Sequence, residues 1–240
     1  VIYEYALSEA IPEHLTPYEY NPVIVEMTSA ELEEYREMTT KLIRTSASDE
    51  VDEEVSERIA MKRADILKRA ENKYDRLRRV LGQMNEIEHL LVYTNSEQID
   101  QVQRILNEFG AVHHKFTYEE GEEERDMLLE QFAEGTHEAL VAMKCLDEGV
   151  NVPATRTAIL MSNSGNPMQF IQRRGRVLRH AEGKERAVIY DMIVVPTLSP
   201  DEDTRKSEQN ILSKELERFE EFAANAINEH SARNSIQRLR

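Results

Sequence analysis

Residues 89–116 read HLLVYTNSEQIDQVQRILNEFGAVHHKF. Residues 89–93 are apolar enough for a buried strand, residues 96–109 repeat apolar side chains at helical spacing, and residues 111–116 again favour a strand. Gly110 is expected to end the helix, because glycine adopts the left-handed conformation that closes many helices. This stretch therefore predicts a strand, a helix and a second strand, the repeating unit of an α/β fold.

The same alternation continues along the chain. Further helices are predicted at residues 121–132 and from Asn166, with Pro167 in the first turn. Further strands are predicted at residues 139–143, 156–161 and 187–193. Alternating strands and helices are joined by right-handed crossovers, so we predict the α/β class, with a mostly parallel sheet flanked by helices.

The flanking segments differ from this central region. Residues 1–28 are punctuated by prolines and predict an extended link with a short strand at 23–27. Residues 29–84 carry apolar residues at helical spacing, but few of them, which predicts a helical arm. The α/β domain is expected to occupy residues 85–196, and residues 197–240 a charged linker with a C-terminal helix.

Apolar side chains recur on one face of the C-terminal helix. They are Ile211, Leu212, Leu216, Phe219, Phe222, Ala223 and Ile227. A stripe of this kind packs on the chain's own sheet or docks another subunit. We favour the first interpretation and leave the second open.

Composition and charge exclude several classes of protein. The 46 acidic and 30 basic residues give a net charge of −16, which rules out a basic surface over the whole chain but not a local basic stripe. The single cysteine excludes a disulfide framework and a cysteine-cluster metal site. No apolar run is long enough to span a membrane. An acidic chain with few lysines fits a protein that works in high salt or an ordinary acidic one.

Targeting signals are absent from the sequence as it stands. The chain begins with Val1 and carries no signal peptide, so we expect a cytoplasmic piece of a longer protein.

The segment QRRGRVLR, residues 172–179, is the most specific chemical signal. On a helix, Gln172, Arg176 and Arg179 lie on one face. The arginine guanidinium is a planar donor that matches phosphate oxygens, so this face predicts an anion site. A solvated helix face with internal ion pairs is the alternative, but the segment contains no acidic residue.

Two further segments follow predicted strands. MKCLDEGVNVP, residues 143–153, leaves one strand, and Thr94 and Asn95 leave another and open a helix that Ser96 is expected to cap. In α/β sheets the carboxyl ends of the strands form the ligand-binding edge, and a helix start suits a phosphate. Simple capping by Ser96 explains the second segment equally well.

These three segments, in this order, resemble motifs IV, V and VI of superfamily 2 helicases, and residues 88–195 resemble the second RecA-like domain of that family. The stretches LDEGVNVP and QRRGRVLR are most similar to those of XPB-like DNA repair helicases. The resemblance implies a RecA-like sheet and makes residues 1–28 a link from a missing first RecA-like domain. It also implies that residues 29–84 are a thumb-like insertion that grips DNA, whereas a solvated helix of alternating charge explains the same residues equally well.

The resemblance also implies roles for single residues. Arg176 and Arg179 would be arginine fingers on the γ-phosphate of ATP, with Gln172 positioning the nucleotide or the attacking water. The nucleotide-binding residues would be Gly149, Asn151 and Arg173. The nucleic-acid contacts would be Thr94, Asn95, Lys144, Arg78 and Arg79. The family usually carries Ser or Thr where Met143 stands, and Asp where Asn151 stands.

The resemblance implies a DNA helicase or translocase that uses ATP with Mg²⁺. The sequence has no phosphate loop or magnesium motif, so both are expected on the missing domain, and this chain alone is expected to be inactive. DNA is favoured over RNA because Gln172 begins motif VI, where RNA helicases usually carry His. The expected partners are DNA and the upstream RecA-like domain, with a nuclease or repair subunit left open and no membrane.

Two other functions remain open. The chain also fits a motor piece of a restriction or phage-defence complex, or a nucleic-acid-binding module that has lost catalysis. A metal site at His113, His114 and His137 is disfavoured because no companion ligands stand at suitable spacing.

Overall fold

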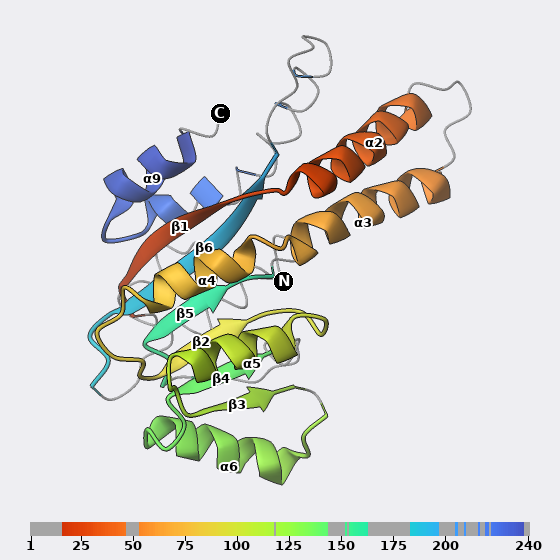
Figure 1. Cartoon of the computed structure of the whole chain (residues 1–240). Helices are drawn as coiled ribbons and strands as arrows, with labels where there is room; N and C mark the ends of the chain where they lie inside the picture. The colour runs from red at the N-terminus through yellow and green to blue at the C-terminus, as the bar shows by residue number, and fades with distance from the viewer. Residues whose placement is uncertain are drawn as a thin grey trace, which may run out of the picture.

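The computed structural model describes residues 16–46, 53–117, 119–143, 152, 154–162, 183–196, 205, 209, 216, 219–220 and 222–237. Within these residues, six strands form one parallel sheet in the order β1-β6-β5-β2-β4-β3 (Figure 1). The strands are β1 (Tyr18–Glu26), β2 (Leu90–Tyr93), β3 (His113–Phe116), β4 (Ala139–Ala142), β5 (Thr157–Leu160) and β6 (Ala187–Val195). The predicted α/β class and parallel sheet are confirmed.

Helices cover both faces of the sheet. Helices α4 (Lys73–Leu81) and α5 (Ile99–Glu108) cover one face, and α6 (Glu122–Ala133) and α9 (Glu229–Gln237) cover the other. The remaining described helices are α2 (Ser29–Ser46) and α3 (Glu53–Arg69). In β2, Leu90 and Val92 pack with α4 and α5, whereas Leu91 and Tyr93 pack with α6 and the C-terminal helices. Because both faces of the strand are buried, its sequence is a continuous apolar run rather than an alternating one.

The first strand differs from the predicted link. β1 runs for nine residues and pairs with β6 from Tyr18 opposite Ala187 to Glu26 opposite Val195. It lies at the edge of the described sheet, where proline is tolerated because only one side of the strand needs backbone donors, and Pro22 sits in its middle. Part of the segment expected to be a link therefore belongs to the sheet, and the strand expected at 23–27 is longer.

The C-terminal segment packs against this sheet. Leu216, Phe219, Phe222 and Ala223 are buried in the core cluster that contains the two β1 tyrosines, which confirms the favoured interpretation for these residues. Ile227 was expected on the same apolar face but is 61% exposed, because it lies in a turn after the helical residues 222–224. Ile211 and Leu212 lie outside the described residues. Helix α9 follows and was not predicted.

The helical arm consists of α2 and α3 alone. These two helices lie side by side and extend away from the sheet (Figure 1). The guanidinium carbon of Arg63 lies 5.3 Å from the centre of the Tyr35 ring, and Tyr35 is buried. Helix α4 was expected to belong to the arm, but its apolar face is buried in the core with α5. The buried residues of that face are Leu77, Val80 and Leu81.

The ends of α5 correct one prediction and confirm another. Ser96 was expected to cap this helix, but the helix begins at Ile99, and the Asn95 side chain accepts the Gln98 N–H at 3.1 Å instead. Gly110 follows the helix with φ of 73°, the left-handed conformation expected for it.

The helix predicted from Asn166 lies outside the described residues. Across the described part of the chain, no helix has the length and hydrophobicity needed to cross a membrane.

Candidate functional site at the carboxyl edge of the sheet

Three neighbouring strands, β5, β2 and β4, end together at the carboxyl edge of the sheet. The Met161 N–H donates to Tyr93 O at 2.9 Å, and the Thr94 N–H donates to Ala142 O at 2.9 Å, so the strand ends are aligned. The segments that resemble motifs IV and V leave the sheet directly after β2 and β4. The segment that resembles motif VI, residues 172–179, follows β5 further along the chain and lies outside the described residues. The strand order therefore brings the starts of the motif IV and V segments together, beside the end of β5, at the edge where α/β proteins bind ligands.

The loop after β2 is described in full. Thr94 is 1% exposed, and its hydroxyl donates to Gln98 Oε1 at 3.0 Å, so this hydroxyl is used inside the loop rather than presented at the edge. The Asn95 side chain is partly buried, and its Nδ2 lies 3.4 Å from Lys68 O at the end of α3. Sequence reasoning missed Gln98 because a glutamine near a helix start is normally solvated.

The other residues predicted at this edge lie outside the described residues. They are Lys144, Gly149, Asn151, Gln172, Arg173, Arg176 and Arg179. Their chemistry fits a nucleotide and a nucleic-acid backbone, because guanidinium, amide and ammonium donors match phosphate oxygens and glycine permits close backbone approach. Their roles remain predictions.

Arg78 and Arg79 lie in the last turn of α4, at the amino edge of the sheet and away from the carboxyl edge (Figure 1). Arg78 donates through Nε and Nη2 to the two carboxylate oxygens of Glu108, at 2.8 and 3.0 Å. This pairing raises the pKa of the Arg78 side chain. Arg79 is exposed. The predicted contact of these arginines with DNA would thus lie on a different edge from that of Asn95.

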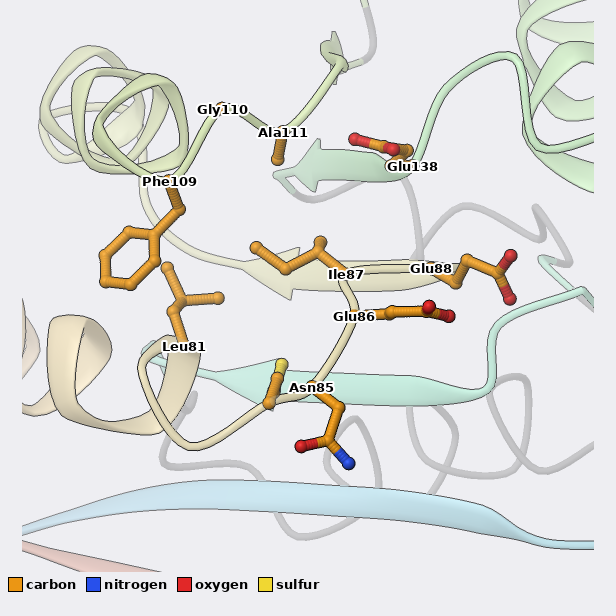
Figure 2. Close-up of a pocket in the computed structure, with 10 residues that line it drawn as sticks. Leu81, Asn85, Glu86, Ile87, Glu88, Phe109, Gly110, Ala111 and Glu138 are labelled. Carbon is orange, nitrogen blue, oxygen red and sulfur yellow. The ribbon is translucent and has the colours of Figure 1, made fainter.

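A pocket of about 480 Å³ also lies at the amino edge (Figure 2). Leu81, Ile87 and Phe109 supply its apolar part. Its acidic residues are Glu86, Glu88 and Glu138. Carboxylates repel phosphate groups, so this pocket is unsuited to a nucleotide.

The three histidines do not form a metal site. His137 lies beside His114, with ring centres 5.5 Å apart, and its Nε2 contacts Gln131 Oε1 at 3.0 Å. Burial, together with the charges of His114 and His113, lowers the pKa of His137. Among the residues whose positions are described, no group of three or more histidine, cysteine or acidic side chains is arranged to hold a metal ion.

Comparison with known proteins agrees with this geometry. Residues 72–181 match the family described as the helicase conserved C-terminal domain. The chain is also 25% identical over 198 residues to the DNA 3'-5' translocase XPB2 of Sulfurisphaera tokodaii. Over residues 72–181 the chain is therefore similar to the C-terminal domain of superfamily 2 helicases. The matched region covers 75% of the chain and 44% of that relative, so the chain spans less than half the length of the translocase it matches.

Solved structures agree with a RecA-like fold for this chain. The SWI2/SNF2 ATPase core of Sulfolobus solfataricus in complex with dsDNA matches 93% of the chain and 49% of its own length, with a TM-score of 0.60 and 16% identity. The C-terminal domain of the same ATPase matches 82% of the chain and 86% of its own length, with a TM-score of 0.56 and 16% identity. At this identity the likeness establishes the fold alone.

Proposed function

We propose that the chain is the C-terminal motor half of an ATP-dependent DNA helicase or translocase of the XPB-like kind. One observation carries the proposal: the segments that resemble motifs IV and V start from the neighbouring strands β2 and β4, at the edge where β5, the strand that precedes residues 172–179 in the chain, also ends. The similarity to a DNA translocase favours DNA as the substrate and movement along it as the activity.

On this proposal the arginines of residues 172–179 act on ATP held by another domain. Arg176 and Arg179 donate to the γ-phosphate oxygens and stabilise the charge that spreads over the transferring phosphoryl group. Gln172 orients the nucleotide or the attacking water. The remaining nucleotide contacts are Gly149, Asn151 and Arg173. ATP with Mg²⁺ supplies the phosphoryl group, and the phosphate loop and metal ligands belong to the first RecA-like domain.

The nucleic-acid path follows from the described loop. The Asn95 amide sits at the carboxyl edge beside the end of α3, so a DNA strand that contacts Asn95 and Lys144 also passes the base of the arm. The Thr94 hydroxyl holds this loop through Gln98 and reaches a phosphate only if that hydrogen bond opens. DNA repair is the process we propose for the whole protein, with a nuclease or repair subunit as a further partner.

ATP turnover by the complete protein tests the proposal directly. It is measured without DNA, with single-stranded DNA and with duplex DNA, beside this chain alone at the same concentration. We expect DNA-stimulated turnover in the complete protein and none in this chain. Absence of turnover in the complete protein at every salt concentration would instead support a binding module without catalysis.

A further inference from the structure

A buried lysine lies where the arm meets the sheet. Lys73, the first residue of α4, is 2% exposed. Its Nζ donates to Met161 O at 2.6 Å and to Lys68 O at 2.9 Å. Lys68 stands in the last turn of α3, and Met161 directly follows β5. One ammonium group therefore joins the end of the arm to the end of the strand that leads into the arginine-bearing segment.

Other bonds fix the same junction, residues 68–73, from the arm and from β1. Glu31, in the first turn of α2, accepts the Glu71 N–H at 2.9 Å and the Thr28 N–H at 2.8 Å. The Asn72 side chain donates to Glu26 O at 2.8 Å. The start of α2 and the end of α3 therefore meet at one hydrogen-bonded junction. Among the bonds described there, those of Lys73 and Asn95 lead toward the centre of the sheet.

Burying a lysine at this position is energetically unfavourable. Burial lowers the pKa of Lys73 to about 7, partly opposed by the negative charge of Glu31, while the charge of Lys68 lowers it further. A buried apolar side chain of similar size would avoid this penalty and would often be as stable or more stable. What an apolar side chain lacks is a directed bond to the Met161 carbonyl, so the lysine fixes a relative position rather than adding to the core. The ammonium and the neutral amine both carry at least two N–H donors, so both forms can serve these two carbonyls.

We propose that Lys73 is a positioning residue that couples the arm to the carboxyl end of β5, so that DNA bound by the arm changes the placement of the arginines that follow. This inference rests on the proposed function for its consequence, because it concerns how DNA stimulates ATP turnover. Its structural part, that Lys73 holds the arm in register with the sheet, concerns this chain alone.

The structural part is tested by the distance between two spin labels. Cysteines replace Glu57 on the arm and Asp100 on α5, both exposed, in a chain whose single native cysteine, Cys145, is changed to serine. We expect Lys73→Met to broaden the distance distribution. Lys73→Gln, which matches Met in length but keeps an N–H donor, should partly restore the narrow distribution. Lys41→Met, on the exposed face of α2, is the matched control and should leave the distribution unchanged.

The functional part is tested by ATP turnover in the complete protein with the same variants. Loss of hydrogen bonds from a charged donor costs enough to lower DNA-stimulated turnover by about tenfold in Lys73→Met. Turnover without DNA and the affinity for DNA should stay at the wild-type value. A stimulation that falls while DNA affinity is retained separates a coupling role from a loss of folding or of binding.

The outcomes are distinguishable from those for the proposed function. An unchanged distance distribution in Lys73→Met overturns the inference whatever the complete protein does. A broadened distribution with unaltered stimulation leaves the junction structural and overturns the coupling. If the wild-type complete protein has no ATP turnover, the proposed function fails, while the distance measurement still decides whether Lys73 holds the arm. If Lys73→Met does not fold, Lys73→Gln carries the same test. If Lys73→Gln then has the wild-type distance distribution and stimulation, Lys73→Ala decides: the inference stands only if Lys73→Ala broadens the distance distribution and lowers the stimulation of ATP turnover.

Discussion

The side chain of Asn228 bonds both backbone polar groups of Tyr20. Its Oδ1 accepts the Tyr20 N–H at 2.9 Å, and its Nδ2 donates to Tyr20 O at 3.1 Å. Tyr20 lies on β1, at the edge of the described sheet, where unpaired backbone groups can pair with another chain. The Asn228 amide therefore satisfies the two backbone groups of Tyr20 that a further strand would otherwise bond. It also joins the C-terminal segment to β1.

Removing this amide should destabilise the fold. Asn228→Ala leaves the two backbone groups of Tyr20 without these partners, and we expect the free energy of unfolding to fall by about 1–3 kcal/mol. Urea denaturation of the chain measures the change. Asn234→Ala on α9, where the side chain is exposed, is the control and should alter stability much less. Equal effects of the two variants would show that the bonds to Tyr20 contribute nothing measurable.

The buried Lys73 should make stability depend on pH. The pKa of Lys73 is about 7 in the folded chain and 10.5 in its ordinary state. Between these two values the unfolded chain holds a proton on this lysine that the folded chain has released, so Lys73 makes the free energy of unfolding rise with pH over that window. The free energy of wild type minus that of Lys73→Met should therefore increase from pH 7 toward pH 10. A difference that stays constant would contradict the lowered pKa.

Arg179 tests the arginine-finger assignment. Changing it to alanine in the complete protein should lower ATP turnover by about 10³-fold, because a positive charge at the transferring phosphoryl group is lost. DNA affinity should be retained. Arg186→Ala serves as the control, since Arg186 is exposed and pairs with Glu19 on β1. Turnover that matches this control would remove Arg179 from the catalytic residues.

Arg79 tests whether DNA reaches the amino edge of the sheet. Arg78 is paired with Glu108, so Arg79→Glu is the cleaner charge reversal of the two. We expect weaker DNA binding and a dependence of affinity on salt that is less steep by roughly one phosphate contact. Arg104→Glu on α5 makes the same change in net charge at another exposed position. If both variants give the same salt dependence, the DNA path is confined to the carboxyl edge.

The sequence predicted the central sheet because strands buried on both faces are continuous apolar runs. It missed most of β1, since Pro17, Pro22 and the polar residues around them are typical of a link, and only the strand's place at an edge makes them acceptable. It placed α4 in the arm because α4 is as highly charged as α3. The apolar stripe of α4, which includes Leu77 and Leu81, is narrow, and only its contact with α5 in the folded chain shows that it belongs to the core.

The candidate site was predictable to the extent that its residues are specific in sequence. The position of Asn95 at the carboxyl edge follows from a strand that ends at Tyr93. Gln98 and Lys73 were not predictable, because a polar side chain on a helix is ordinarily solvated and burial depends on contacts distant in the sequence. Lys73 lies 88 positions from Met161, the residue whose carbonyl it contacts.

The arm has the proportions of a lever. Helix α2 contains 18 residues, and at about 1.5 Å per residue it is about 27 Å long. A rotation of about ten degrees at its base moves its far end by about 5 Å, which exceeds the rise of about 3.4 Å between neighbouring nucleotides of a DNA strand. A small rotation at the junction therefore moves the tip of the arm by a distance comparable to one step along a nucleic acid. If DNA binds the tip as proposed, the same geometry converts a movement of the tip into a smaller movement at the base.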